Sequence, residues 1–174
     1  MAGVDTLEFR NLRSVEEVQA ARVFEEGGYT SDEGASLESM RYRFDHAAHL
    51  FLGAFDQKGA LVGYVMSTQA DAPLVTHRSM EEHDPRGSTV CIHSVCVNPL
   101  WQRKGVASRL LEAYTSSICK YNSSLDPSGY KIKRLALLSR ENLIPLYERA
   151  GYTTLGKSSV VHGTETWYDC IMDL

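Results

Sequence analysis

The chain has 174 residues and a net charge of −4, and 43% of its residues are apolar and 23% charged. These values are ordinary for a soluble domain with its own core, so we expect a single domain over residues 1–174. The mild acidic balance argues against a nucleic-acid partner. No apolar run is long enough to cross a bilayer, so we expect no membrane partner.

The cysteines and the first residues predict a reducing compartment. Cys91, Cys96, Cys119 and Cys170 form no C-x-x-C pair and lack zinc-ligand spacing, so we expect free thiols and no metal. The segment MAGVDTLEFR lacks the apolar core of a secretory signal. Because free thiols are typical of reducing compartments, we expect a cytoplasmic protein.

The first 45 residues predict one strand and two helices. LEFRNL alternates as a strand does, and Ser14 with Glu17 three residues later forms a capping-box signature. The helix that follows is expected to end near Glu26. After the polar loop GGYTSDEGAS, Ser36 is expected to cap a second helix over about residues 37–45.

Residues 49–99 predict a hairpin, a surface excursion and a long strand. HLFLGAFDQKGALVGYVMSTQA has the pattern of two strands joined at Gln57-Lys58-Gly59. Residues 71–88 contain turn residues and mixed charge, which predict a surface excursion with one short helix and a solvated SMEEHD face. STVCIHSVCVNP is rich in β-branched residues and predicts a strand.

From Val106 the spacing of apolar residues becomes helical. The buried stripe of this helix is expected to hold Val106, Leu110, Ala113, Tyr114 and Ile118. The segment KIKRLALLS then predicts another strand, which becomes continuously apolar toward its end.

The segment NLIPLYERAGY predicts a last helix with Asn142 as its N-cap. Pro145 falls in the first turn, where its missing N–H costs nothing, and Gly151 suits the position after the C-cap. One face is expected to carry Leu143, Leu146, Tyr147 and Ala150. Two strands, near residues 152–156 and 164–172, complete a mixed α/β domain.

The hexapeptide QRKGVA, residues 102–107, follows a predicted strand and opens a helix. A helix N-terminus offers unpaired N–H groups and partial positive charge, so it attracts anions. Gly105 allows a phosphate to approach the backbone, and Arg103 and Lys104 add charge. Neither the P-loop pattern nor G-x-G-x-x-G is present. Two interpretations remain, an ordinary loop and a cradle for a pyrophosphate.

Together with its flanks, Q-x-x-G-x-A resembles the acetyl-CoA signature of the GCN5-related N-acetyltransferases, the GNAT superfamily. Within it, the chain resembles the serotonin (arylalkylamine) N-acetyltransferase family. The segments HRSMEEHDPRGS, CIHSVCVNP and IPLYERAGY carry this resemblance, which runs from about Leu7 to the final strand. It implies a GNAT fold with a mostly antiparallel mixed sheet. About seven strands and about four helices are expected, with acetyl-CoA in the splay between the fourth and fifth strands.

The resemblance also implies an activity and a set of binding residues. The expected reaction transfers acetyl from acetyl-CoA to the primary amine of a small arylalkylamine, by direct attack in a ternary complex and without a metal. The pantetheine arm would pair with the backbone of Val95, Cys96 and Val97. The pyrophosphate would bind the backbone of Arg103, Lys104, Gly105, Val106, Ala107 and Ser108.

Two residues are candidates for proton transfer. His93 is the candidate base, acting through a water, because histidine has an unperturbed pKa of about 6.5. The family has histidines at both 91 and 93, whereas this chain has Cys91, so no two-histidine relay is expected. Tyr147 matches the acid tyrosine of the family and can protonate the departing thiolate. By pattern alone, His93 would be a structural residue and Tyr147 a core residue.

The resemblance places Tyr29 and Leu138 at the amine pocket. The loop near Tyr29 is polar and contains Asp32 and Glu33, which leaves a polyamine as an alternative substrate. A peptide or protein amine is a further alternative, and so is a sensor that binds CoA without turnover. The phosphorylated tails through which vertebrate relatives bind 14-3-3 proteins have no counterpart in the sequence, so we expect no such partner.

Overall fold

The computed structural model describes residues 4–174, which form two compact units. The first unit contains the described chain up to Met66 together with Ser94–Tyr114. The second contains Ser67–His93 together with Thr115–Leu174.

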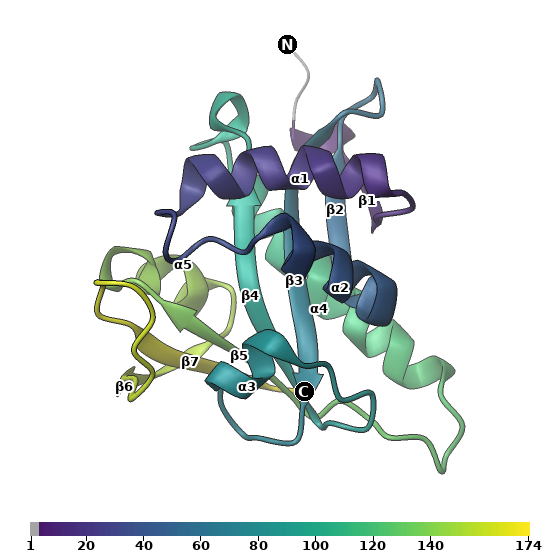
Figure 1. The fold of residues 1–174 in the computed structure, drawn as a ribbon. Coiled ribbons are helices and arrows are strands. Elements are labelled where there is room, and N and C mark those ends of the chain that lie inside the picture. The colour runs from purple at the N-terminus through teal and green to yellow at the C-terminus, as the bar shows by residue number, and fades with distance from the viewer. Residues whose placement is uncertain (1–3) are drawn as a thin grey trace. The chain divides into compact units, whose positions relative to one another are not determined.

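Helices and strands follow the predicted mixed order (Figure 1). The α-helices are α1 (Val15–Gly28), α2 (Leu37–Ala47), α3 (His77–Glu81), α4 (Val106–Ser124) and α5 (Ile144–Arg149). The strands are β1 (Glu8–Asn11), β2 (Phe51–Phe55), β3 (Leu61–Ala70), β4 (Thr89–Val97), β5 (Arg134–Ser139), β6 (Thr153–Lys157) and β7 (Tyr168–Asp173). The boundaries between the two units therefore fall inside β3, β4 and α4.

Within residues 4–174, the strands form one sheet of seven in the order β1-β2-β3-β4-β5-β7-β6. The pair β4–β5 is parallel, whereas β1–β2, β2–β3, β5–β7 and β6–β7 are antiparallel. This arrangement confirms the predicted mixed, mostly antiparallel sheet. The hairpin at Gln57-Lys58-Gly59 and the short helix within residues 71–88 are confirmed as well.

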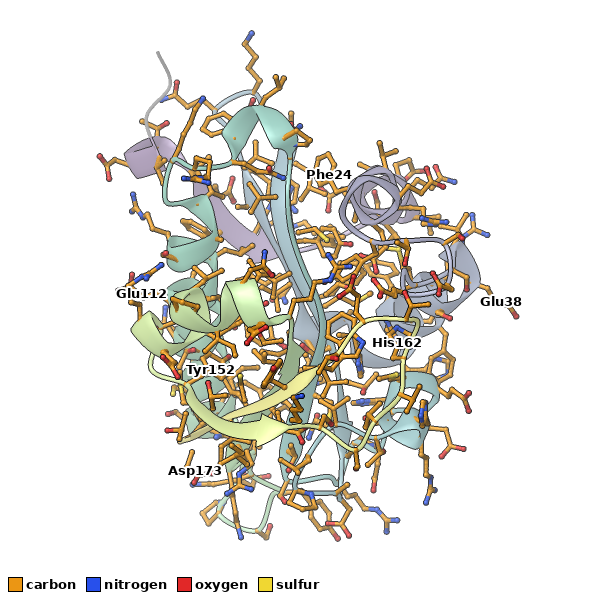
Figure 2. All side chains as sticks on the ribbon, turned by 90° about the vertical axis from the view of Figure 1, so that its left-hand side faces the viewer. Phe24, Glu38, Glu112, Tyr152, His162 and Asp173 are labelled. Carbon is orange, nitrogen blue, oxygen red and sulfur yellow. The ribbon has the colours of Figure 1, made fainter. Side chains whose placement is uncertain are left out.

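In the first unit, α1 and α2 cover one face of the strands and the first turns of α4 lie on the other (Figures 1 and 2). Val18 and Ala21 of α1 are fully buried, as is Met40 of α2. They belong to one core cluster with Phe51 and Tyr64 of the strands. Residues three and four apart share one helix face, which explains why this stripe of α1 packs inward.

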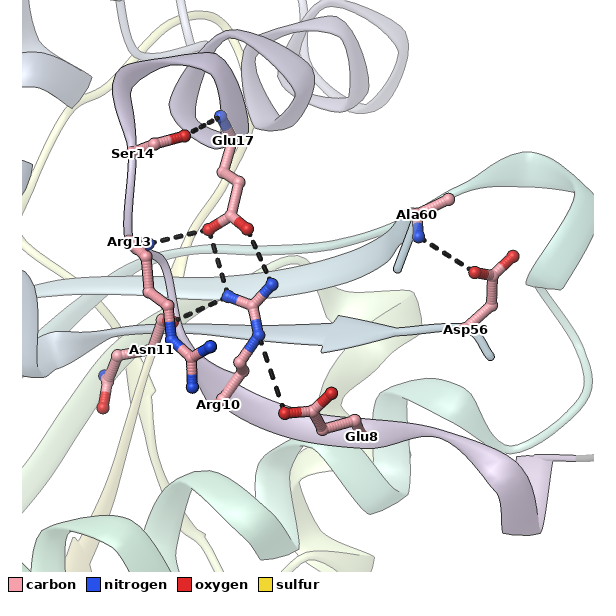
Figure 3. Close-up of polar contacts among 8 residues, drawn as sticks. All are labelled: Glu8, Arg10, Asn11, Arg13, Ser14, Glu17, Asp56 and Ala60. Carbon is pink, nitrogen blue, oxygen red and sulfur yellow. Dashed lines mark hydrogen bonds and ion pairs between the residues drawn. The ribbon is translucent and has the colours of Figure 1, made fainter. Parts of the chain in front are cut away.

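The start of α1 shows how a local sequence signal becomes structure (Figure 3). The Ser14 hydroxyl accepts the N–H of Glu17 at 3.3 Å, as a capping box requires. The Glu17 carboxylate instead accepts the N–H of Arg13 at 2.7 Å. It also forms two bonds with the Arg10 guanidinium, at 2.7 and 3.1 Å. The Glu17 carboxylate thus joins the first turn of α1 to β1.

A pH-dependent contribution to stability follows from this contact. The Arg10 hydrogen bond, with the N–H of Arg13, lowers the pKa of Glu17. A depressed pKa in the folded state stabilises the protein above the unfolded pKa of about 4.3, and this contribution is lost as pH falls through the folded value. Glu17→Gln should therefore cost about 1 kcal/mol at pH 7, and the difference should vanish near pH 2. Urea unfolding at both pH values measures this, and an equal loss at both would contradict it.

In the second unit, β5 lies between β4 and β7. It pairs in parallel with β4 over Thr89–Ile92 and antiparallel with β7. Leu135, Ala136 and Leu137 are successive buried residues of β5, as expected for a strand that is covered on both faces. At its start, Arg134 pairs with Asp173 of β7 at 2.6 Å.

Two predicted strand starts are wrong. β5 begins at Arg134 rather than Lys131, because the side chain of Asn122 bonds both the N–H and the carbonyl of Ile132, at 2.9 and 2.7 Å. β7 begins at Tyr168 rather than Thr164. Thr164 follows Gly163, which has a φ of 67° and forms a turn before the strand.

The predicted start of the last helix is also wrong. Asn142 lies inside a 3₁₀ turn, Glu141–Leu143, and α5 begins at Ile144. The N–H of Leu143 bonds the carbonyl of Arg140 at 3.0 Å, so the turn itself precedes the helix without a side-chain cap. Leu143 is exposed instead of sharing the buried face. Pro145 does lie in the first turn, and Gly151 follows the C-cap with a φ of 98°, as predicted.

Candidate active site

The turn between β4 and α4 lies in the first unit and is held by polar side chains. Asn98 accepts the N–H of Leu100 at 2.9 Å. Gln102 donates to the carbonyl of Val97 at 2.9 Å, which ties the turn back to the end of β4. The glutamine of the Q-x-x-G-x-A signature therefore has a structural partner that the motif alone did not reveal.

This turn has an unusual backbone conformation. Arg103 has a φ of 62° and Gly105 a φ of 84°, and both values lie in the left-handed region. A non-glycine residue rarely adopts that region, and α4 starts at Val106, directly after Gly105. Residues 102–105 are exposed. The N–H groups of the first turn of α4 thus follow an exposed turn that carries two cationic residues.

Charge and open space accompany this conformation. A side chain added at Gly105 would have nothing within 4 Å, so the glycine leaves the backbone accessible. The Lys104 ammonium donates to the carbonyl of Leu100 at 2.9 Å and lies 5.7 Å from the Trp101 ring centroid. An anion could approach this backbone without displacing a side chain at Gly105.

The side chains at the end of β4 alternate between buried and half-buried. Cys96 is buried, whereas Val95 and Val97 are half-buried. Burial raises the pKa of the Cys96 thiol far above its ordinary range, so this group is a neutral thiol at physiological pH. The Cys96 side chain is part of the core and bonds Glu25, so it is not presented to solvent.

A buried carboxylate in the first unit was missed by sequence reasoning. Glu25 of α1 is 1% exposed and accepts hydrogen bonds from the hydroxyls of Tyr64 and Ser94 and from the Cys96 thiol. It also accepts the N–H of Ala35 at 2.9 Å. We refer to these five residues as the Glu25 cluster. Because every partner donates, the cluster joins α1 to β3, β4 and the loop before α2.

Burial around the Glu25 cluster, and the charge of Glu25, shift the pKa values of Tyr64 and Arg43. Burial, together with the Cys96 thiol and the Glu25 carboxylate, raises the pKa of Tyr64 well above its ordinary value. Burial lowers the pKa of Arg43 to about 10, although the charge of Glu25 acts in the opposite direction. The sequence does contain a signal for Glu25, because it lies four residues after Ala21 and seven after Val18, on the buried face of α1.

His93 lies in the second unit on β4 and is half-buried. Its Nε2 is 2.8 Å from the hydroxyl of Thr68 on β3. Thr68 in turn donates to the backbone carbonyl of Ser79 in α3 at 2.5 Å. Ser79 is buried, so the SMEEHD segment is not the uniformly solvated face that its charges predicted. Its serine faces the interior and caps α3 together with Thr76.

Cys91 is fully buried two residues before His93. Burial raises the pKa of its thiol to about 11. At neutral pH this thiol therefore keeps its proton and cannot act as a base.

The remaining predicted residues are distributed between the two units. In the first, Tyr29 is half-buried against the core, and its N–H bonds the carbonyl of Glu25 at 3.0 Å. In the second, Leu138 packs on the cluster around Cys91. Tyr147 is 6% exposed, and its ring lies 5.9 Å from that of Tyr152 (labelled in Figure 2).

The acidic loop residues differ from each other. Asp32 is exposed, whereas Glu33 is 6% exposed. In the loop that leaves a polyamine as an alternative substrate, the carboxylate of Asp32 is therefore exposed to solvent and that of Glu33 is buried.

The family model described as "Acetyltransferase (GNAT) domain" matches residues 18–167. The chain therefore belongs to the GNAT acetyltransferase family, and the predicted GNAT fold is confirmed. In sequence, it is 26% identical to serotonin N-acetyltransferase of Mesocricetus auratus over 133 residues. That alignment covers 76% of this chain but only 60% of the relative.

Solved structures agree on the fold. The loading GNATL domain of CurA from Lyngbya majuscula has a TM-score of 0.77 at 13% identity, covering 96% of this chain and 97% of that one. A chain of the NatC complex bound to Gag peptide and CoA has a TM-score of 0.74 at 15% identity, covering 97% and 98%. Within residues 4–174, no helix is long and apolar enough to span a membrane.

Proposed function

We propose that this chain, acting as one catalytic domain, is an acetyl-CoA-dependent N-acetyltransferase for the primary amine of small arylalkylamines. The observation that carries the proposal is the turn before α4 in a member of the GNAT family. Its left-handed Arg103 and Gly105 expose the backbone at the start of a helix, where a pyrophosphate is stabilised by N–H groups and positive charge.

The residues present fit such a substrate. The phosphates would bind the backbone from Arg103 to Ser108, and the pantetheine arm would pair with Val95, Cys96 and Val97. Relatives in this fold include a complex whose structure contains CoA, which supports the same class of ligand. Acetyl-CoA would supply the acetyl thioester, and the residues of this chain would position it and move the protons.

Two residues carry the proton transfers in this proposal. An alkylammonium has a pKa of about 10.4, so the amine must lose a proton before it attacks. His93 accepts that proton, directly or through a water. Tyr147 donates its phenolic proton to the thiolate that leaves when the C–N bond has formed and the C–S bond breaks. No step in this sequence requires a metal.

Arylalkylamines are favoured by the sequence similarity to serotonin N-acetyltransferase. Tyr29 and Leu138 are the proposed contacts for the aromatic part of the amine. The polyamine alternative keeps one exposed carboxylate, Asp32, since Glu33 is buried. A single exposed ion pair adds little affinity, so the polyamine is the weaker candidate.

The test is turnover of acetyl-CoA, followed by thiol release, with tryptamine, phenylethylamine, spermine and a short peptide. We expect the highest kcat/KM for the two aromatic amines. A preference for spermine would assign the chain to polyamines, and a preference for the peptide would assign it to protein N-acetylation. Binding of CoA without turnover of any amine would identify a sensor instead of an enzyme.

The turn itself provides a further prediction. Gly105→Ala places a side chain in the left-handed region, which costs about 1 kcal/mol, although no atom obstructs it. We expect the KM for acetyl-CoA to rise about tenfold with a smaller change in kcat, because a displaced backbone binds the pyrophosphate less well. Gly59→Ala, at a φ of 78° in the β2–β3 hairpin, is the matched control. An equal rise in KM in both variants would reject a specific role for this turn.

A further inference from the structure

A chain of hydrogen bonds in the second unit ends at His93. The Thr68 hydroxyl lies between two partners, 2.5 Å from the carbonyl oxygen of Ser79 and 2.8 Å from Nε2 of His93. Thr68 is fully buried and Ser79 is 2% exposed, so the bond between them is sheltered from water, whereas His93 is half-buried. The proton transfers described above assign no role to Thr68.

The direction of each hydrogen bond follows from proton counting. A backbone carbonyl has no proton to give, so the bond between Thr68 and Ser79 must use the hydroxyl proton of Thr68. A threonine hydroxyl has only that one proton. It therefore cannot also donate to His93, and the remaining bond requires an N–H at Nε2 with the Thr68 oxygen as acceptor.

We propose that Thr68 is a positioning residue that holds neutral His93 in the tautomer with its proton on Nε2, so that Nδ1 is the basic nitrogen. The tautomer of a neutral histidine is set by the hydrogen bond of the other nitrogen, and only the unprotonated nitrogen can accept a proton. The relevance to catalysis rests on the proposed function, whereas the tautomer itself rests on geometry alone.

The short helix α3 fixes this arrangement. It ends at Glu81, two residues after Ser79, and carbonyls in the last turn of a helix need donors from outside the helix. Thr68 satisfies the carbonyl of Ser79, and the capping interactions of Thr76 hold Ser79 in place. The surface excursion between β3 and β4 thereby determines which nitrogen of His93 is basic.

The direct test is the tautomer of His93 in the full chain, measured by two-bond ¹H–¹⁵N correlation spectra at a pH where the imidazole is neutral. His93→Gln identifies its signals among the six histidines. We expect the Nε2–H form in the wild type and in Thr68→Ser, which keeps the hydroxyl. In Thr68→Val, we expect a mixture of tautomers. A wild type with the proton on Nδ1, or an unchanged spectrum in Thr68→Val, would overturn the proposal.

Kinetics provide the second readout. Thr68→Val should lower kcat about tenfold with little change in the KM for acetyl-CoA, and Thr68→Ser should restore kcat. Thr89→Val is the matched control, because Thr89 is equally buried on β4, and it should leave kcat near the wild-type value. Equal losses of kcat in Thr68→Val and Thr68→Ser would show that the hydroxyl does not position His93.

The two proposals fail separately. A wild type without acetyl transfer to any amine would reject the proposed function, and the spectrum would still decide the tautomer. An active wild type with the proton on Nδ1 would retain the function and reject the role of Thr68.

Discussion

His93→Ala is expected to lower kcat for the preferred amine about a hundredfold or more, with little change in the KM for acetyl-CoA. A general base contributes a factor of this order, and its removal leaves the bound ammonium without a nearby proton acceptor. Steady-state thiol release measures both constants. The histidine acts on the amine and does not bind the cofactor in our proposal, so the loss should appear in kcat.

The pH dependence of that loss is the sharper part of the prediction. The unprotonated amine becomes more abundant in solution as pH rises toward the pKa of the ammonium, about 10.4. At higher pH the variant can bind the amine already deprotonated, so the absence of His93 matters less. The ratio of wild-type to variant kcat/KM should therefore shrink between pH 7 and pH 9.5. His77→Ala, an exposed histidine at the start of α3, is the control and should behave as the wild type. A loss that is constant over this range would point to a structural role for His93.

Glu25→Gln is expected to lower the free energy of unfolding by about 3 kcal/mol. The carboxylate accepts hydrogen bonds from four groups, on Tyr64, Ser94, Cys96 and Ala35. The amide of a glutamine has one oxygen and one NH₂ group, so its NH₂ group would face two of these donors, which would then have no acceptor. A buried donor left without an acceptor costs about 1–3 kcal/mol, and a charged acceptor adds to this. For a chain of this length the expected fall in Tm is about 6–12 °C.

A neighbouring residue supplies the control. Glu26 is exposed and pairs with Arg22 at 3.2 Å, so Glu26→Gln should change stability by less than about 0.5 kcal/mol. Hydrogen exchange adds a local measurement, since the amide of Ala35 should lose protection in Glu25→Gln at temperatures where the protein stays folded. If Glu25→Gln were as stable as Glu26→Gln, the Glu25 cluster would not hold the loop before α2.

Local sequence patterns determined most of the elements. Ser14 and Ser36 cap α1 and α2 as predicted, because an N-cap depends on residues within one turn. The β2–β3 hairpin and the glycine after α5 were found for the same reason. The motif QRKGVA was sufficient to locate an exposed turn at the start of α4, since glycine marks a backbone conformation that other residues avoid.

The errors in the boundaries of β5 and α5 have different causes. The side chain of Asn122 forms hydrogen bonds with the N–H and the carbonyl of Ile132. These groups are then not available to a neighbouring strand, so β5 begins after Ile132. A 3₁₀ turn makes the cap at Asn142 unnecessary. The Asn122 contact joins residues ten positions apart and forms only when the chain has folded, whereas the 3₁₀ turn is a local bond between Leu143 and Arg140 that the capping pattern did not predict.

The same distinction between local pattern and distant contact applies to the candidate site. Residue type and spacing indicated the candidate groups, namely a histidine on a strand, a tyrosine on a helix and a glycine before a helix. The protonation and burial of these groups depend on contacts that the folded chain makes. Thr68 and His93 are 25 residues apart in sequence, and Glu25 is 69 residues from Ser94. Burial and hydrogen bonding act through space, so the proton on His93, the neutral thiols of Cys91 and Cys96 and the role of Glu25 follow from packing rather than from any local pattern.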